Sequence, residues 1–444
     1  MRTLSLLFSV IFLTWLTDVV AQEPWGLEKC VNYAIEHNIQ VKQKKLKAES
    51  SKSSLQQSRI DLAPDLNASL SNSYQYGYTV DPFTNDFTDT RMNSLSTGVN
   101  SQITFFNGLQ KINTIKQNNY TLLADLQEIE ETKNSITIMV ATSYLQILFD
   151  KELLEVAKNQ MGITQSQVDR TKILVDAGSL AKGNLLEIQA QLANEELAKI
   201  NAENNLRSSF LNLTQLLELD TNNAFQIEVP SLDDPSSMLM IDSIQKIYEE
   251  SLDLPQIRKQ EYLLQSSEKS LLISKGGLSP ILYMQASYGS GYSSARTLPD
   301  GSAYSNSDQL IDNRSLSLVF GLQVPIFNNF SVKNRISQSK LSVENSKYQL
   351  ELSKRQLFKD IQQARNSADA ALARFKASQK AEEAQQESFS YTQQKFDLGL
   401  VNSVDYNTAK NQLTKVQSEK VQSKFEFLFR VNILNFYMGI PFKL

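Results

Sequence analysis

The chain has 444 residues and a formal net charge of −4 at pH 7, from 44 Lys and Arg residues against 48 Asp and Glu residues. This near-balance argues against a nucleic-acid-binding protein, which needs a basic patch. One histidine (His37) and one cysteine (Cys30) cannot build a structural zinc site or a disulfide. Only 15 glycines and 10 prolines occur, and 41% of the residues are hydrophobic, which disfavours a loop-rich enzyme and a multi-span helical membrane protein. We therefore expect no catalytic residues, no metal site and no cofactor.

The first 21 residues have the layout of a secretory signal peptide. Arg2 precedes an apolar run from Leu4 to Leu16, and the segment ends in the small residue Ala21. We expect cleavage after Ala21. The alternative is an N-terminal membrane helix, which is disfavoured because the apolar run is short and Asp18 interrupts it.

The rest of the chain contains the same pattern twice. Identical residues recur 221 positions apart over a long stretch without a gap, at Phe106 and Phe327, Gly178 and Gly399, Leu192 and Leu413, and Leu213 and Leu434. This constant spacing indicates two copies of one unit. We place repeat 1 at 22–219 and repeat 2 at 244–444, joined by a polar linker at 220–243.

Each repeat is expected to contain a helix, two strands, one very long helix and a final helix, in that order. In repeat 1 these elements are predicted at 27–60, 66–78, 95–106, 108–176 and 184–217. In repeat 2 they are predicted at 244–275, 281–292, 315–327, 330–398 and 405–437. Within the first helix, Cys30 is expected to be a small buried apolar side chain, and His37 a surface or helix-end residue.

The four predicted strands alternate between apolar and small polar side chains. In the last strand Leu318 and Phe320 share one face, and Ser317 and Gly321 share the other. This period is typical of a strand, and the length suits a tilted bilayer crossing, which takes about 9–11 residues. The small polar faces are expected to line water. The alternative is an amphipathic hairpin on a soluble core, which normally uses strands of about 5–6 residues.

Four strands are too few for a closed barrel, because single-chain membrane barrels begin at about eight strands. An open sheet in lipid would leave the N–H and C=O groups of its edge strands unpaired, at several kcal/mol each. We therefore expect several chains to share one barrel. The strand count alone permits a dimer with eight strands or a trimer with twelve.

Two helices are expected to be exceptionally long. No proline occurs from Gly108 to Asp176 or from Val332 to Leu398, so each run can form one helix of roughly 100 Å at about 1.5 Å per residue. A plain coiled-coil rod is the alternative, but a rod has no need of membrane strands. Supercoiled packing is indicated by a heptad series that is apolar in seven of its eight positions: Leu126, Lys133, Val140, Ile147, Leu154, Met161, Val168 and Val175.

Both long helices are followed by a glycine. Gly178 and Gly399 suit the left-handed position that ends a helix. The next helices are expected to begin near Asn184 and Asp405, which are both good N-cap residues. Each long helix is therefore expected to turn back at its far tip.

These turns carry a duplicated motif: a glycine, an acid or amide six residues later, a small residue ten later (a position that Ile188 occupies in the first copy) and a leucine fourteen later. The motif occurs as Gly178, Asn184, Ile188 and Leu192, and as Gly399, Asp405, Ala409 and Leu413. The strand-to-helix joints QITFFNG (102–108) and QVPIFNN (323–329) belong to the same order. Over essentially the whole mature chain, this arrangement resembles the outer-membrane efflux family typified by TolC.

The resemblance implies a mainly helical fold with membrane strands. Three chains would form a homotrimer with a twelve-strand β-barrel, four strands from each chain, continued by a long coiled-coil barrel of helices across the periplasm. It also implies a location in the cell outer membrane. A periplasmic adaptor protein and an inner-membrane transporter would be the partners.

The resemblance also assigns residues at the tip. The turn residues that would contact the adaptor are Gly178, Leu180, Gly399 and Leu400. The pore constriction would involve Asp405, Glu187 and Asn184. By threefold symmetry Asp405 and Glu187 would form acidic rings that favour cations. A simple helix cap is the alternative role for Asp405.

The tip departs from the family pattern in one respect. In some members an Arg two residues after the second glycine pairs with an Asp six residues after the first and holds the tip shut. Val401 and Asn184 occupy these positions here, so this lock cannot form. Ser179 also replaces the usual apolar residue.

The leading interpretation is a passive exit duct, the outer membrane channel of a tripartite efflux system driven by its partner pump. Type I protein secretion would use the same duct with a different partner, which the sequence does not name. A trimeric structural or adhesive coiled-coil protein is disfavoured by the internal duplication. An enzyme such as a glycosidase with paired carboxylates is disfavoured because the carboxylates lie on solvated helical flanks.

Overall fold

A computed structural model describes residues 24–81, 85–89, 91–219, 226–230, 243–440 and 442. The expected signal peptide at 1–21 and most of the expected linker at 220–243 lie outside these residues. The chain divides into two compact units. The helix unit comprises Met1–Lys42, Glu131–Asp253 and Gln356–Leu444, and the sheet unit comprises Gln43–Glu130 and Leu254–Arg355.

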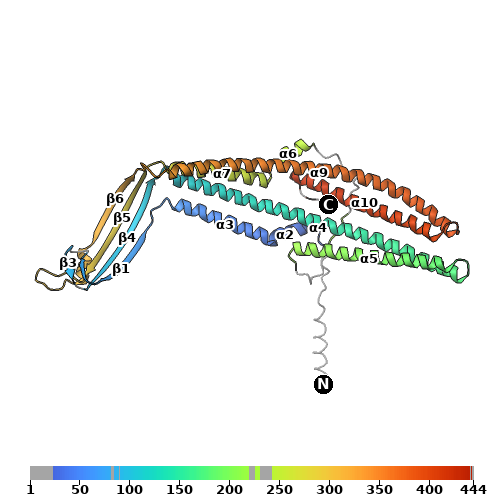
Figure 1. Ribbon diagram of the computed structural model, residues 1–444, viewed down its shortest axis with the longest axis horizontal. Helices are drawn as coiled ribbons and strands as arrows, with labels where there is room; N and C mark the ends of the chain where they lie inside the picture. The colour runs from blue at the N-terminus through green and yellow to red at the C-terminus, as the bar shows by residue number, and fades with distance from the viewer. Residues whose placement is uncertain are drawn as a thin grey trace, which may run out of the picture. The chain divides into compact units, whose positions relative to one another are not determined.

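The described residues form mainly helices, with a small antiparallel sheet (Figure 1). The helices are α2 (Leu27–His37), α3 (Ile39–Ile60), α4 (Gln110–Asp176), α5 (Lys182–Leu216), α6 (Ile244–Ser251), α7 (Pro255–Gly276), α8 (Asn306–Asp312), α9 (Ser331–Asp397) and α10 (Ser403–Tyr437). The strands are β1 (Asn67–Gln75), β2 (Tyr78–Val80), β3 (Phe87–Asp89), β4 (Met92–Phe106), β5 (Ile281–Ser293) and β6 (Ser315–Gln323). Each of the two long runs without proline is one continuous helix, because α4 and α9 both have 67 residues.

Four strands form one antiparallel sheet in the order β1-β4-β5-β6, which leaves β1 and β6 at its edges (Figure 1). The register aligns like side chains across all four strands. One row contains Ala68, Val99, Tyr288 and Leu316, and the next contains Asn67, Asn100, Ser287 and Ser317. Since successive residues point to opposite faces, one face is apolar and the other small and polar, in agreement with the alternation in the sequence.

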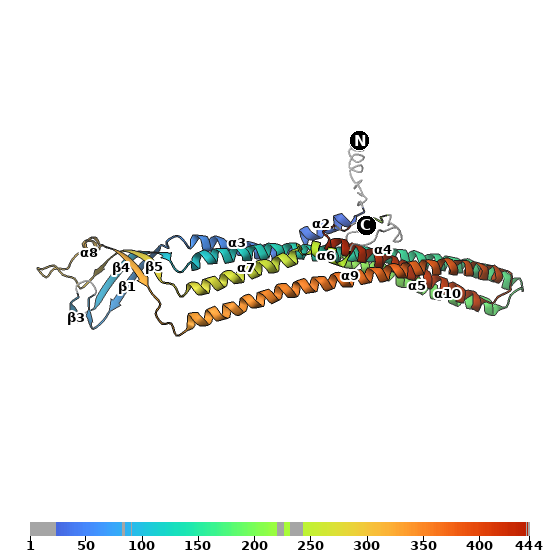
Figure 2. The same ribbon diagram turned by 90° about the horizontal axis from the view of Figure 1, so that it is seen from above.

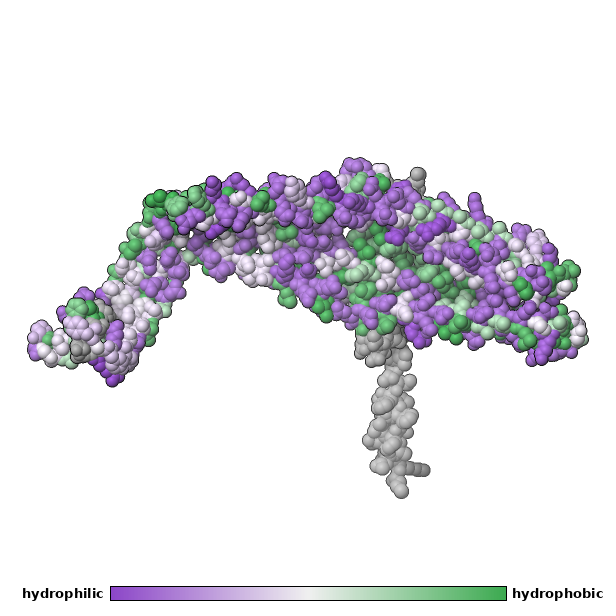
Figure 3. All heavy atoms as spheres, viewed as in Figure 1, coloured by the Kyte–Doolittle hydropathy of each residue, from purple (hydrophilic) through white to green (hydrophobic). Residues whose placement is uncertain are grey.

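The apolar face of the sheet is largely exposed in the single chain. Leu70 is 73% exposed, and Phe320 is 70% exposed. Apolar atoms also gather where β6 leads into α9 (Figure 3), a segment in which Ile326 is 95% exposed and Phe327 is 71% exposed. A contiguous apolar surface of this kind indicates contact with a membrane or with another protein.

Within the residues that the structure describes, no helix combines the length and the apolar character that a bilayer crossing requires.

The helix expected over 27–60 is two helices, because Asn38 interrupts it. The backbone of Asn38 is extended, with ψ at 129°. Its side-chain oxygen accepts hydrogen bonds from the N–H groups of Gln40 at 2.8 Å and Val41 at 3.4 Å. This cap satisfies two of the donors that a helix start leaves unpaired, so α3 begins afresh at Ile39.

Three other boundaries differ from the expected ones for reasons of backbone chemistry. The helix expected over 244–275 restarts at Pro255, which lacks the N–H of an interior residue but suits the first turn. The strand expected over 315–327 ends at Gln323, ahead of Pro325, which cannot donate to a ladder. The strand expected over 66–78 is divided at Gly77, whose φ is +100°.

Part of the expected linker belongs to the helix unit. Ile227 forms a parallel bridge with Trp25, and the hydroxyl of Tyr144 donates to the carbonyl of Glu228 at 2.6 Å. Cys30 packs in the same core and is fully buried, as expected. Burial raises the pKa of the Cys30 thiol to about 12, so it is unreactive. His37 ends α2 and stacks on Tyr33, with ring centroids 4.0 Å apart.

The loop between β5 and β6 contains a helix that the sequence analysis did not predict, α8. The last residues of β5 extend past Ser315, the first residue of β6, and so have no partner strand on that side. Gln309 of α8 pairs with them instead. The N–H of Ser293 donates to Gln309 Oε1 at 2.9 Å, and Gln309 Nε2 donates to the carbonyl of Ser293 at 3.0 Å. Asn313 Nδ2 donates to the carbonyl of Gly291 at 2.7 Å. These side chains pair the backbone of the β5 edge.

Two glycines bring the backbones of the β4–α4 joint and of the α7–β5 joint together in the sheet unit. A Cβ added at Gly108 would lie 2.3 Å from the carbonyl oxygen of Gly276, and one added at Gly276 would lie 2.5 Å from the carbonyl oxygen of Gly108. Gly108 also has φ at +67°. Neither position therefore has room for a side chain.

Candidate functional site at the helix tip

The candidate site lies in the helix unit, at two turns that we call the tip: residues 177–181 between α4 and α5, and 398–402 between α9 and α10 (Figure 1). Gly178 and Gly399 have φ at +75° and +73°, the left-handed conformation expected from the sequence. The N–H of Ser179 donates to the carbonyl of Leu174 at 2.8 Å, and the N–H of Leu400 donates to that of Lys395 at 2.8 Å. Both turns therefore close in the same way, by a Schellman motif.

The turn residues differ in exposure. Leu400 is 70% exposed, whereas Leu180 is half-buried. Gly178 and Gly399 are exposed, and a Cβ added at either would meet nothing within 4 Å. The second turn thus offers an apolar side chain next to accessible backbone, and the first turn offers mainly backbone.

The helices that follow the turns begin earlier than expected, and their caps are not the predicted ones. Asn402 caps α10, because its side-chain oxygen accepts from the N–H of Asp405 at 2.9 Å. Asp405 is instead an exposed residue in the first turn of α10. There its negative charge is favourable beside the positive end of the helix dipole. The N-cap of α5 is Ala181, so Asn184 also lies within its helix.

The structure brings two of the predicted pore residues together. α5 and α10 lie side by side (Figure 2), and the buried hydroxyl of Ser403 on α10 donates to a carboxylate oxygen of Glu187 on α5. The same hydroxyl lies 3.2 Å from the side-chain oxygen of Asn184. Glu187 and Asn184 therefore hold α5 against α10, and Asp405 is not part of this contact.

A second contact joins the long helices just before they turn. Arg170 of α4 lies 2.7 Å from the carboxylate of Asp397, the last residue of α9. Both side chains are partly exposed, so this ion pair is worth at most about 1 kcal/mol. Together with Ser403, it links the two turns without the Arg–Asp lock that Val401 and Asn184 preclude.

The sequence analysis missed a buried cation behind the tip. Lys410 of α10 is fully buried, and its Nζ donates to the carbonyl of Gln160 at 2.7 Å, to the hydroxyl of Thr164 and to Glu195 at 2.9 Å. Burial lowers the pKa of Lys410, and the hydrogen bond that Lys410 donates to Glu195 opposes that shift. This ammonium group joins α10 to both α4 and α5.

The position of Lys410 in the sequence indicates that it faces the core of the helix unit. It lies between the buried residues Tyr406 and Leu413, at the i+4 and i−3 spacing of one helix face. A lysine in an apolar stripe requires either a route to solvent or a buried partner. Beside it, burial raises the pKa of Tyr406 to about 12, and this ring packs 4.8 Å from that of Phe396.

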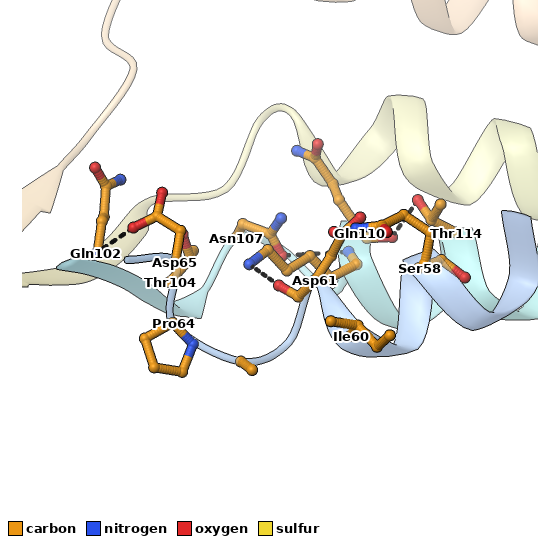
Figure 4. A pocket seen from close by; sticks show the side chains of 13 residues that line it. Ser58, Ile60, Asp61, Pro64, Asp65, Gln102, Thr104, Asn107, Gln110 and Thr114 are labelled. Atoms are coloured by element: carbon orange, nitrogen blue, oxygen red, sulfur yellow. Dashed lines mark hydrogen bonds between the residues drawn. The ribbon is translucent and has the colours of Figure 1, made fainter. Parts of the chain in front are cut away.

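A polar pocket of about 550 Å³ lies in the sheet unit, between the α3–β1 joint and the β4–α4 joint (Figure 4). Its carboxylates are already used by the fold. Asp65 Oδ1 accepts from the N–H of Gln102 at 2.7 Å, and Asp61 Oδ1 accepts from Gln57 at 2.6 Å. Lys111 donates to the carbonyl of Asp61 at 2.5 Å. The hydrogen bonds of Asp61, Asp65 and Lys111 therefore hold these two joints together.

Comparison with known proteins identifies the family. The family model described as outer membrane efflux protein matches residues 30–218 and 247–439. The chain is 20% identical over 308 residues to the outer membrane protein TolC of Vibrio cholerae, covering 68% of this chain and 66% of that protein. It is 22% identical to TolC of Escherichia coli, covering 70% of this chain and 63% of that protein. The aligned part thus spans slightly less than two thirds of both relatives.

Solved structures show the same fold. A crystal structure of CusC superposes with a TM-score of 0.80 at 14% identity, covering 93% of this chain and 92% of that chain. The chain therefore belongs to the outer membrane efflux protein family and is a protein of the outer membrane.

Proposed function

We propose that the protein is the passive exit duct of an efflux system, a homotrimer that receives substrates from an inner-membrane pump through a periplasmic adaptor protein. The observation that carries this proposal is the four-stranded sheet, which has an apolar face, a polar face and two open edges. The apolar face suits lipid, and the polar face suits a water-filled lumen.

The open edges require partners. In lipid, the unpaired N–H and C=O groups along β1 and β6 would cost several kcal/mol each. Three copies of the sheet, joined β1 to β6, pair every edge and give twelve strands. The helices of the three chains would then continue the wall as a tunnel, and no catalytic residue is needed because the pump supplies the energy.

Cysteine cross-linking tests the joined edges. Cys30 is buried and is the single cysteine of the sequence, so a Cys30→Ala background is suitable. We expect Ser317→Cys on β6, paired in turn with cysteine at Ser69, Ser71 or Ser73 on β1, to give a disulfide-linked trimer for at least one pair. A disulfide needs Cα atoms within about 7 Å, so the three positions sample successive registers of β1 against β6.

The control pair is Ser71→Cys with Ser287→Cys. These residues lie on β1 and β5, which are separated by β4, so no cross-link should form. Monomers alone for all three edge pairs, in membranes that contain the protein, would contradict a shared barrel.

Within this function, the tip residues take the roles that the family resemblance assigns. The adaptor would contact Gly178, Leu180, Gly399 and Leu400, where backbone and an exposed leucine are accessible. Asp405 would form the acidic ring of the constriction, since its side chain is exposed at the start of α10. Glu187 and Asn184 would border the ring while holding α5 to α10 through Ser403.

Neutralising the proposed ring should change ion selectivity. We expect Asp405→Asn to lower the preference for cations, because three negative charges leave the constriction. The measurement is the reversal potential of purified protein in planar bilayers under a KCl gradient. Glu155→Gln is the control, since Glu155 is an exposed residue of α4 paired with Lys158 and lies away from the tip. An unchanged reversal potential in Asp405→Asn would remove this residue from the pore.

A further inference from the structure

The polar face of the sheet carries one aromatic side chain. No Asp, Glu, Lys or Arg occurs in β1, β4, β5 or β6, and the polar face consists mainly of serine, asparagine, glutamine and glycine. Tyr283 of β5 interrupts this pattern, paired with Thr104 of β4 and Gly321 of β6. These pairs lie at the end of the sheet from which the strands lead to the long helices.

The ring of Tyr283 occupies the space above Gly321. A Cβ added at position 321 would lie 2.2 Å from Cζ of Tyr283, 2.5 Å from its hydroxyl oxygen and 2.6 Å from Cε1. The backbone of Gly321 is that of a regular strand, and its φ is not in the left-handed region. The backbone conformation at position 321 would therefore accept any residue. Glycine is required there because the ring of Tyr283 fills the space that a side chain would occupy.

We propose that Gly321 allows the ring of Tyr283 to lie flat on the sheet, and that this pair sets the free cross-section of the duct at the end of the sheet next to the long helices. This inference rests on the proposed function, in which the polar face lines the lumen. Each of three chains would contribute one such ring at the same level. Rings that lie on the wall leave the passage wide, whereas rings pushed off the wall by a side chain at position 321 would narrow it.

Because the strands carry no charge, the pair would act on solutes by their size. The hydroxyl oxygen of a tyrosine lies about 6.5 Å from its Cα by ordinary bond lengths, more than twice the reach of a serine. Three such rings turned inward would obstruct bulky solutes much more than small ions. The pair is thus a size-determining element, separate from the charged residues at the tip.

The test measures single-channel conductance of the full purified protein in planar bilayers, with and without neutral polyethylene glycols of graded size. We expect Gly321→Ala to lower the conductance and to exclude smaller polymers than the wild type does. The double variant Gly321→Ala with Tyr283→Ala should recover the wild-type values, because no ring remains to be displaced. Gly98→Ala is the control: it lies on the same face, and the atom nearest to its Cβ would be the carbonyl oxygen of Tyr288, at the ordinary contact distance of 3.4 Å.

Several outcomes would overturn the inference. The inference would be wrong if Gly321→Ala had the conductance and the polymer size limit of the wild type. It would also be wrong if the double variant kept the lowered conductance of Gly321→Ala. If Gly321→Ala fails to form an SDS-resistant oligomer, the double variant should restore that oligomer, and a failure to restore it counts against the pair. A wild-type protein that never conducts would instead refute the duct itself, which separates the two failures.

Discussion

Replacing Lys410 by alanine is expected to destabilise the helix unit by about 3–5 kcal/mol, the range for breaking a buried ion pair. The side chain of Glu195 is 11% exposed, so without its partner it would hold a nearly buried negative charge. The carbonyl of Gln160 and the hydroxyl of Thr164 would also lose their donor. Thermal unfolding followed by circular dichroism in detergent measures the loss as a lower Tm.

Two further variants separate charge burial from packing. Lys410→Met with Glu195→Gln removes both charges at similar volume and should recover most of the lost stability. The remaining difference from wild type would come from the carbonyl of Gln160 and the hydroxyl of Thr164, which still lack their donor. Lys424→Ala is the matched control, because Lys424 also joins α10 to α4 through an ion pair of 2.9 Å, with Glu152, but in a more accessible place. It should cost no more than about 1 kcal/mol. Equal Tm shifts for Lys410→Ala and Lys424→Ala would show that burial of Lys410 has no energetic consequence.

Replacing Gly108 by alanine is expected to have the second large effect. The added Cβ would lie 2.3 Å from the carbonyl oxygen of Gly276 and 2.7 Å from Cβ of Ser279, and φ is +67°. Strain in the left-handed region costs about 1–2 kcal/mol, and forcing two backbones apart adds about 1–3 kcal/mol. We expect less SDS-resistant oligomer in the outer membrane and a lower unfolding temperature.

Gly178→Ala provides the comparison for Gly108→Ala. Gly178 has φ at +75°, but a Cβ there meets nothing within 4 Å. It should therefore show only the cost of the left-handed conformation, about 1–2 kcal/mol. If both variants lost the same amount of stability, the contact between Gly108 and Gly276 would not matter, and the effect of Gly108→Ala would be conformational alone.

The periodic features of this fold could be predicted from the sequence, because they depend on residues that are close together in the chain. The alternation around Leu318 and Ser317 correctly gave the two faces of the sheet, and Gly178 and Gly399 correctly gave the left-handed turns. These features are local, since a strand has period two and a helix end needs one residue with positive φ. The mainly helical fold followed from the long runs without proline.

Features that depend on distant residues or on competing caps were not predictable in the same way. The structure caps α10 with Asn402 instead of the expected Asp405, and the acid at Asp405 then lies in the first turn, where the helix dipole favours it. The contact between Gly108 and Gly276 joins segments far apart in sequence. The partners of Lys410 come from two other helices. Its spacing therefore indicated a buried lysine but not the groups that pair with it.

The way Gln309 completes the edge of β5 has a practical consequence for immunology. A synthetic peptide copied from residues 294–314 would lack Ser293 and Gly291, the backbone partners of Gln309 and Asn313. Such a peptide lacks the strand β5 to which the loop is hydrogen-bonded. Its conformations in solution therefore differ from the conformation of the loop in the folded protein. Antibodies raised with it should recognise blotted, denatured protein far better than the folded protein, and a useful immunogen must include the whole hairpin.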